Sequence, residues 1–219
     1  MTYLQLCKAV RAKLGLGSGP STTINQTGRL ADIVAAVSQA WIDIQLSSDH
    51  WRFLRVPAQA VNTTPALALY DYVKWPSLLT LKTLNAIRYA ADNKPLIEMD
   101  YDLYLQQYSK TGGTGAPTHY ILDLEDRVIL YPTPDIDYAL ELDYYKRPQV
   151  LSANTDVPMI PDEYHQSIKW RALFTLASDF ADDVVYSESV GEYNSAISLL
   201  QGRYLPKMKI GSSLFSKNG

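Results

Sequence analysis

The chain has 219 residues, of which 47% are hydrophobic and 20% are charged, and its formal net charge at pH 7 is −3. This composition is typical of a folded globular protein with one large domain or two small ones, and it argues against a disordered chain. Because nonspecific nucleic-acid binding needs a basic surface, the slight acidity also argues against a protein that binds DNA or RNA broadly.

The numbers of cysteine and tyrosine residues give further information on the class of protein. The chain has 1 cysteine, Cys7, and 16 tyrosines. A lone cysteine forms no internal disulfide, and the sequence shows neither a signal peptide nor an apolar run of membrane-spanning length. We therefore expect a protein of the reducing cytoplasm without membrane contact. Tyrosine suits cores and subunit contacts alike, and we favour positions in the core and the sheets.

Two helices are expected near the N-terminus. Residues 2–14 begin with a capping-box pattern of Thr2 and Gln5, and the apolar residues that follow share one side. Residues 28–46 repeat the same rhythm, with Thr27 as the expected cap. A loop rich in glycine and polar residues joins the two segments, so the pattern predicts a helical hairpin.

Alternating apolar residues indicate strands in the next part of the chain. Residues 51–56 and 67–72 are expected to form a β-hairpin around a turn at 62–65. Residues 78–89 are ambiguous between strand and helix. The turn-forming residues on both sides of this segment favour a strand.

A short tyrosine-rich helix is expected after Asp100, which is its predicted cap, and a glycine-rich loop follows at 109–117. Residues 118–124, 127–131 and 138–146 then alternate between apolar and polar side chains, which is typical of strands with one solvated face. We interpret these three strands as an antiparallel meander.

The strongest helix pattern spans residues 160–183, where a proline and two acidic residues mark the start. Its apolar face is wider than one stripe, so this helix needs neighbours on more than one side. Leu176 and Phe180 are expected on the central part of that face. A last helix over residues 189–205 opens with the capping box of Ser189 and Glu192.

These elements predict an α+β fold. We expect a helical bundle platform formed by residues 1–48 and 160–206, with an antiparallel β-rich insertion of residues 49–159 that contains one short helix. Residues 207–219 are expected to form a C-terminal tail that orders on a partner. The residues of the tail expected to bind a partner are Lys207, Met208, Lys209, Ile210, Leu214 and Phe215.

The chemical motifs that define enzymes and cofactor sites are not recognisable in the sequence. The glycines at 112–115 lack the Lys-Ser/Thr that completes a phosphate loop, and His50, His119 and His165 lack the spacing of zinc ligands. Cys7 has no local activator, and a serine elbow is missing. We therefore predict no catalytic residues, no cofactor and no metal.

A family pattern is carried by four motifs: Trp-Arg-Phe-Leu at 51–54, Tyr-Pro-Thr-Pro at 131–134, Tyr-Tyr-Lys-Arg-Pro at 144–148 and Ile-Pro-Asp-Glu-Tyr-His at 160–165. In their order and spacing, these motifs resemble the head-to-tail adaptor proteins of tailed bacteriophages, which are also called connector or head-completion proteins. The resemblance spans residues 28–205. It rests on the order and spacing of the motifs and on their aromatic and proline residues rather than on a chemical signature.

The resemblance implies a structural virion protein that is assembled in the host cytoplasm. It implies a ring, commonly dodecameric, that docks under the portal protein and receives tail or nozzle proteins on its other face. DNA would pass through the channel during genome ejection without specific binding. The family has no catalytic residues to transfer to this sequence.

Two alternatives come from other classes of protein. A carbohydrate- or receptor-binding tail module would use the tyrosine-rich strands as stacking platforms, and a hydrolase would assemble its site from residues distant in the sequence. For the adaptor, we expect a neutral to acidic channel wall. The acidic residues that motivate this expectation are Asp179, Asp182, Asp183 and Glu188.

Overall fold

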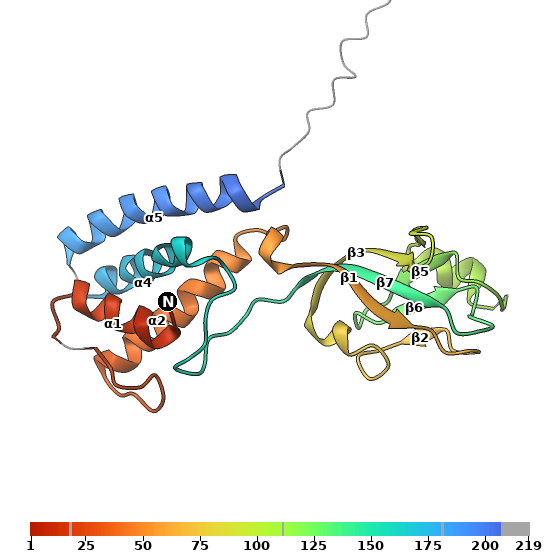
Figure 1. Ribbon diagram of the computed structural model, residues 1–219, viewed down its shortest axis with the longest axis horizontal. Coiled ribbons are helices and arrows are strands. Elements are labelled where there is room, and N and C mark those ends of the chain that lie inside the picture. Colours follow the sequence, from red (N-terminus) through yellow and green to blue (C-terminus); the bar gives the residue numbers. More distant parts are fainter. Residues whose placement is uncertain (18, 111, 181, 207–219) are drawn as a thin grey trace, which may run out of the picture. The chain divides into compact units, whose positions relative to one another are not determined.

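The computed structural model describes residues 1–17, 19–110, 112–180 and 182–206, so the predicted tail lies outside the described residues. The helices and the antiparallel and mixed sheets confirm the predicted α+β class. The chain divides into two compact units (Figure 1). The helical unit comprises Met1–Phe53 and Pro148–Gly219, and the β unit comprises Leu54–Arg147.

The helical unit is built around one central helix. Its helices are α1 (Tyr3–Lys13), α2 (Arg29–Leu46), α4 (His165–Asp179) and α5 (Asp183–Tyr204), with a 3-10 turn, η4 (Asp162–Tyr164), before α4. Helix α4 contacts α1, α2 and α5, which confirms that the central helix needs neighbours on more than one side. The core that these helices share includes Leu6, Val10, Val37, Trp41, Ile168, Leu173 and Leu176.

The first two helices begin differently. Thr2 and Gln5 form the predicted capping box of α1, in which each side chain bonds the backbone of the other residue. The predicted cap of α2, Thr27, is wrong. The cap is Gly28, whose φ of 55° places it in a backbone region that glycine adopts with little strain, and it makes no side-chain hydrogen bond.

The predicted boundary between the last two helices is also wrong. Helix α4 ends at Asp179, and α5 already begins at Asp183, where the carboxylate of Asp182 accepts a hydrogen bond of 3.1 Å from the Val185 N–H. Ser189, the predicted cap, lies buried inside α5 and donates its hydroxyl to the Tyr186 carbonyl at 2.8 Å. An aspartate is an equally good cap, and it lies seven residues earlier.

The β unit contains two sheets. The three-stranded sheet has the order β1 (Arg55–Asn62), β7 (Ala139–Lys146), β3 (Leu81–Tyr89), and all its pairs are antiparallel. The four-stranded sheet has the order β2 (Leu69–Tyr70), β6 (Val128–Tyr131), β5 (His119–Leu122), β4 (Ile97–Glu98), with β4 and β5 parallel. The short helices of the unit are η1 (Arg52–Leu54, which starts in the helical unit), η2 (Pro76–Thr80), α3 (Tyr101–Leu103) and the π-helical turn η3 (Tyr104–Tyr108).

Both sheets contribute to one core, which includes Tyr70, Trp75, Ile87, Tyr120, Leu130, Leu142 and Tyr144. The strand prediction for segment 78–89 is confirmed for residues 81–89 by β3, whereas residues 78–80 belong to η2. Asp100 caps α3 as expected, since its carboxylate accepts from the N–H groups of Asp102 and Leu103. Residues that alternate in the sequence therefore form strands here, as the pattern indicates.

Strand pairing differs from the prediction in two places. The expected hairpin does not form, because β1 pairs with β7 while β2 pairs with β6 in the other sheet. The expected meander holds for β5 and β6, but β7 leaves it to become the central strand of the three-stranded sheet. A central strand needs two partners, and period-two alternation says nothing about which strands they are.

One buried carboxylate lies on β7. The Asp143 side chain is 1% exposed, and it accepts two hydrogen bonds from Arg55, at 2.9 and 2.6 Å. Arg88 donates to it at 3.0 Å and Asn85 at 2.8 Å. Burial alone would raise the pKa of Asp143, yet these donors and the two guanidinium charges hold it below its ordinary value.

Candidate interaction surface

Helix α5 packs on the rest of the helical unit by one narrow face. Its 22 residues include only three buried ones, Ser189, Ile197 and Leu200, and its main neighbour is α4, beside which it runs in Figure 1. Val184 and Leu199 are 76% and 70% exposed. Most of α5 is therefore not covered by the described chain.

The outward side of α5 carries small residues at helical spacing. They are Ser187, Gly191, Ser195, Ser198 and Gly202, and all are exposed. A Cβ added at Gly191 or Gly202 would meet no atom within 4 Å, so contacts within the described chain do not require glycine there. A glycine inside a helix lowers the folding stability by about 1 kcal/mol relative to alanine, and no contact within the described chain explains why glycine is present.

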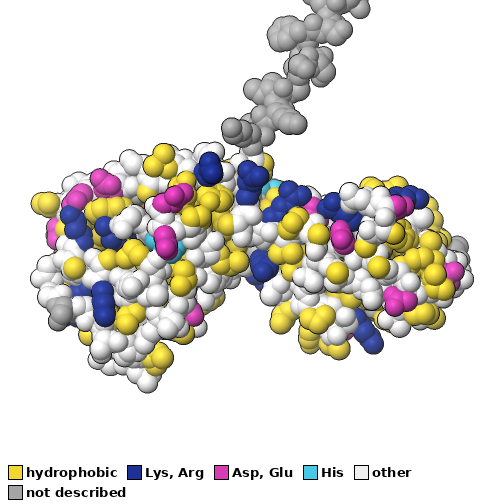
Figure 2. All heavy atoms as spheres, in the orientation of Figure 1, with side chains coloured by type: hydrophobic (Ala, Val, Ile, Leu, Met, Phe, Trp, Pro, Cys, Tyr) yellow, Lys and Arg dark blue, Asp and Glu magenta, His cyan; other side chains and the backbone are white. Residues whose placement is uncertain are grey.

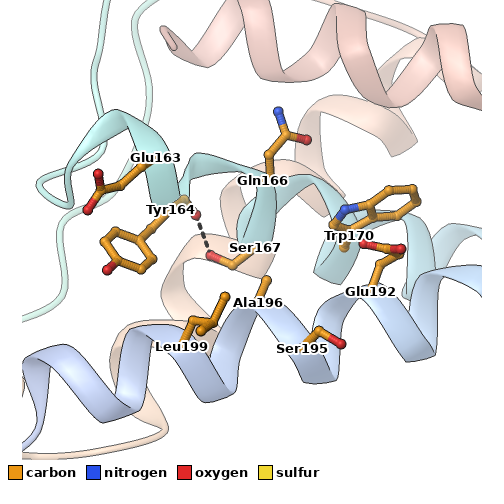
Figure 3. A pocket seen from close by; sticks show the side chains of 9 residues that line it. All are labelled: Glu163, Tyr164, Gln166, Ser167, Trp170, Glu192, Ser195, Ala196 and Leu199. Carbon is orange, nitrogen blue, oxygen red and sulfur yellow. Dashed lines mark hydrogen bonds between the residues drawn. The ribbon is translucent and has the colours of Figure 1, made fainter.

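A groove of about 540 Å³ lies between α4 and α5 (Figure 3). Glu163 and Tyr164 lie toward one end of it, and Trp170 and Glu192 lie toward the other. The α5 wall includes Leu199. The complete lining is Glu163, Tyr164, Gln166, Ser167, Trp170, Glu192, Ser195, Ala196 and Leu199.

One carboxylate lies at each end of the groove, and basic side chains lie close to both ends. The lining includes the carboxylates of Glu163 and Glu192 and no Lys or Arg. Two lysines lie nearby: Lys169 sits 3.9 Å from the centre of the Trp170 ring, and Lys13 pairs with Glu188 at 2.6 Å. Burial lowers the pKa of Lys169. Acidic, basic and hydrophobic side chains are mixed on the visible face of the helical unit (Figure 2).

Aromatic rings fix the end of the groove that lies near the C-terminus of α5. The rings of Tyr164 and Tyr204 meet edge to face at 5.6 Å between centroids, and Tyr204 meets Phe53 at 6.0 Å. Phe53 stacks in turn on Trp41 and Trp51, at 5.8 and 5.3 Å. This cluster joins the end of α5 to α2 and to the chain segment at Trp51, so the groove has a fixed end there.

The residues predicted to bind a partner, Lys207, Met208, Lys209, Ile210, Leu214 and Phe215, lie outside the described residues. Of the four acidic residues expected on a channel wall, Asp182 caps α5 and Glu188 pairs with Lys13. Asp179 and Asp183 are exposed near the turn between α4 and α5. Two of these four carboxylates therefore hold the helices in place.

The groove itself was not predicted from the sequence. One signal pointed to it, because Trp170 widens the apolar face of α4 beyond a single stripe. Leu199 was a second signal, since it falls outside the rhythm of the inward residues Ile197 and Leu200. The position of α5, which decides whether such residues line a groove or a core, does not follow from periodicity.

Other chemistry-bearing residues are held in structural roles. Burial lowers the pKa of His165, whose ring contacts the Ile160 carbonyl at 2.9 Å and the Met1 amino group at 2.6 Å. Burial raises the pKa of the Cys7 thiol to about 12. Among the described residues, no group of three His, Cys, Asp or Glu side chains is placed to hold a metal ion. None of the described helices is long and apolar enough to cross a membrane.

Several tyrosines of the β unit lie in its core. Tyr70, Tyr120 and Tyr144 are nearly inaccessible to solvent. The hydroxyl of Tyr70 donates to the Leu67 carbonyl at 2.8 Å, and burial raises the pKa of Tyr120. Rings in these positions support the sheets and are not available to stack on a sugar.

The groove and the exposed side of α5 together form a surface of the kind that can bind another protein. A model of the SU10 adaptor protein family matches residues 1–208. Because the match covers nearly the whole chain, the protein belongs to this phage-associated adaptor family, whose role is structural and involves contact with other phage structural proteins. A search of curated proteins found no match.

Proposed function

We propose that this protein is a head-to-tail connector of the virion. In this role, many copies form a ring that docks on the portal protein and receives tail or nozzle proteins. The ring is commonly dodecameric in the adaptor proteins that the sequence resembles. DNA passes through the ring during ejection without specific binding. Assembly takes place in the host cytoplasm, and neither catalysis nor a membrane is involved.

The observation that carries the proposal is the outward side of α5. This side leaves Val184 and Leu199 in solvent and keeps Gly191 and Gly202 where the chain alone does not need them. In a ring, every copy has a neighbour on each side, and such a surface would be covered. Small residues at the centre of a contact allow two helices to approach closely, which accounts for the glycines.

The weak acidity of the protein is compatible with a channel. A protein with a net charge of −3 does not bind the phosphates of DNA tightly. Tight binding would slow the release of DNA from the channel wall and hinder its passage. Asp179 and Asp183 would contribute acidic groups if the turn between α4 and α5 faces the channel. Duplex DNA that binds the assembled ring tightly and with strong dependence on salt would contradict this part of the proposal.

A binding experiment with the cognate portal tests the proposal. The purified chain should be monomeric or weakly associated by light scattering, because ring contacts need the partner as a template. After addition of the portal, negative-stain images should show a ring on it. A stable dimer that the portal does not change would refute the connector, and saturable binding of a glycan by the free chain would favour the tail module instead.

A matched pair of variants assigns the ring contact to α5. Val184→Lys places a charge on the outward side of α5, at a residue that does not line the groove, and should weaken ring formation. Ile24→Lys makes the same kind of change in the loop before α2, where Ile24 is 55% exposed, and it should have little effect. Equal assembly by both variants would remove α5 from the contact.

A further inference from the structure

We propose that the groove between α4 and α5 binds the C-terminal segment of a neighbouring copy, through residues 207–210. The inference rests on the proposed ring, in which neighbouring copies are available. It assigns one ligand to the groove, and the C-terminal segment of each copy would bind the adjacent copy.

The chemistry of the segment matches the chemistry of the groove. In an extended Lys-Met-Lys-Ile segment, Met208 and Ile210 point to one side and Lys207 and Lys209 to the other. The groove offers the indole of Trp170 and other apolar atoms to the first pair. Its lining adds two carboxylates and no Lys or Arg, which suits the second pair.

The length of the groove fits this segment. Glu163 and Trp170 are separated by seven positions along the chain, which corresponds to about 10 Å of helical rise. Four extended residues span about 13 Å. Residues 207–210 would therefore fill the groove from one end to the other, and the binding mode is an extended peptide in a preformed site.

The sequence favours a neighbouring copy over the same chain. If residues 207–210 of the same chain reversed direction directly after Pro206, their four residues would reach at most about 13 Å back along α5. Glu192 lies about 18 Å from the end of the helix at Tyr204. The same chain falls short of the far end of its own groove.

Disulfide trapping between two kinds of full-length chain tests the inference. One chain carries Met208→Cys and the other carries Ser195→Cys, and both are mixed with the portal under mild oxidation. Ser187→Cys is the control, because Ser187 and Ser195 are both exposed serines of α5 with hydroxyls bonded to the backbone, at 3.1 and 3.0 Å. Only Ser195 lines the groove. The native thiol of Cys7 is buried and does not compete.

We expect the disulfide between positions 208 and 195 to form between chains in several-fold higher yield than the disulfide between positions 208 and 187. Glu163→Gln combined with Glu192→Gln in the receiving chain should lower that yield several-fold. Equal yields at positions 195 and 187 would overturn the inference. So would a disulfide that forms only within a chain carrying both cysteines, or trapping of Met208→Cys on the portal alone.

The ring is imaged in the same samples, which separates the two proposals. A ring on the portal without trapping at Ser195 would refute the groove as the binding site and leave the connector function intact. Absence of a ring would refute the connector function, and absence of the disulfide in that sample would also count against the groove.

Discussion

Asp143→Asn should destabilise the β unit by about 2 to 4 kcal/mol at pH 7. Removing one partner from a buried ion pair costs about 3 to 5 kcal/mol when the remaining charge stays buried. Asp143 is 1% exposed, whereas the side chains of Arg55 and Arg88 are 41% and 24% exposed and regain part of their hydration. We therefore place the expected loss about 1 kcal/mol below that range.

The effect should depend on pH with a defined sign. The folded-state pKa of Asp143 lies below its ordinary value, so the carboxylate stabilises the fold fully above the unfolded-state pKa, about 4. This stabilisation is lost as the pH falls through the lower folded-state pKa. The difference in unfolding free energy between the native chain and Asp143→Asn should thus be largest near neutral pH and shrink below about pH 4.

Urea unfolding, combined with hydrogen exchange of β7, measures the effect in the β unit itself. Glu141→Gln is the matched control, because Glu141 is half-buried two positions along the same strand and undergoes the same change from carboxylate to amide. A midpoint for Asp143→Asn as high as that of the control would refute the reasoning. A difference that persists undiminished at pH 2 would refute the assignment to ionisation.

Four further changes have defined outcomes. Leu176→Ala should lower the unfolding free energy by about 2 to 5 kcal/mol, because Leu176 is buried. Phe180→Ala should lower it by less, because Phe180 is half-buried at the end of α4. An unchanged thermal midpoint for Leu176→Ala would contradict this prediction. Asp182→Ala should cost about 0.5 to 2 kcal/mol by removing the cap of α5, measured by urea unfolding. Deletion of residues 207–219 should leave the melting temperature nearly unchanged and weaken attachment to the portal; attachment as tight as that of the full chain would contradict it.

Local patterns in the sequence predicted local structure well. The capping box at Thr2 and the cap at Asp100 depend on residues within a few positions of one another, and both are present. The strand β3 is present as well, but its buried residues, Leu81, Leu84 and Ile87, recur at every third position because two irregularities interrupt its pairing with β7. The apolar rhythm around Leu176 likewise placed the central helix in the core. For the two caps and the central helix, the physical cause lies in the same stretch of chain as its effect.

The features that the sequence did not predict depend on distant parts of the chain. Asp143 alternates like a solvated strand residue, and it is buried because Arg55 and Arg88 arrive on the two strands that flank β7. The cap at Gly28 depends on a backbone angle rather than a side chain. The groove exists because α5 packs on α4 at an angle and depth that the periodicity of either helix leaves open.

The glycines of α5 provide a final test, because their effects on the free chain and on the ring should be opposite. In the free chain, Gly191→Ala and Gly202→Ala should each raise the unfolding free energy by up to about 1 kcal/mol, because alanine favours a helix interior more than glycine does. The added methyl groups have room, since nothing lies within 4 Å of either position.

In the ring, the same methyl groups would lie in a close contact between neighbouring copies and should weaken assembly on the portal. Ser198→Ala is the control, because Ser198 lies between the two glycines on the outward side and the change removes an atom rather than adding one. Urea unfolding gives the stability of the free chain, and negative-stain images of a dilution series with the portal give the concentration at which rings form on it. Glycine variants that are more stable and assemble as well as the native chain would show that the outward side of α5 is not a subunit contact. The presence of glycine at these two positions would then need another explanation.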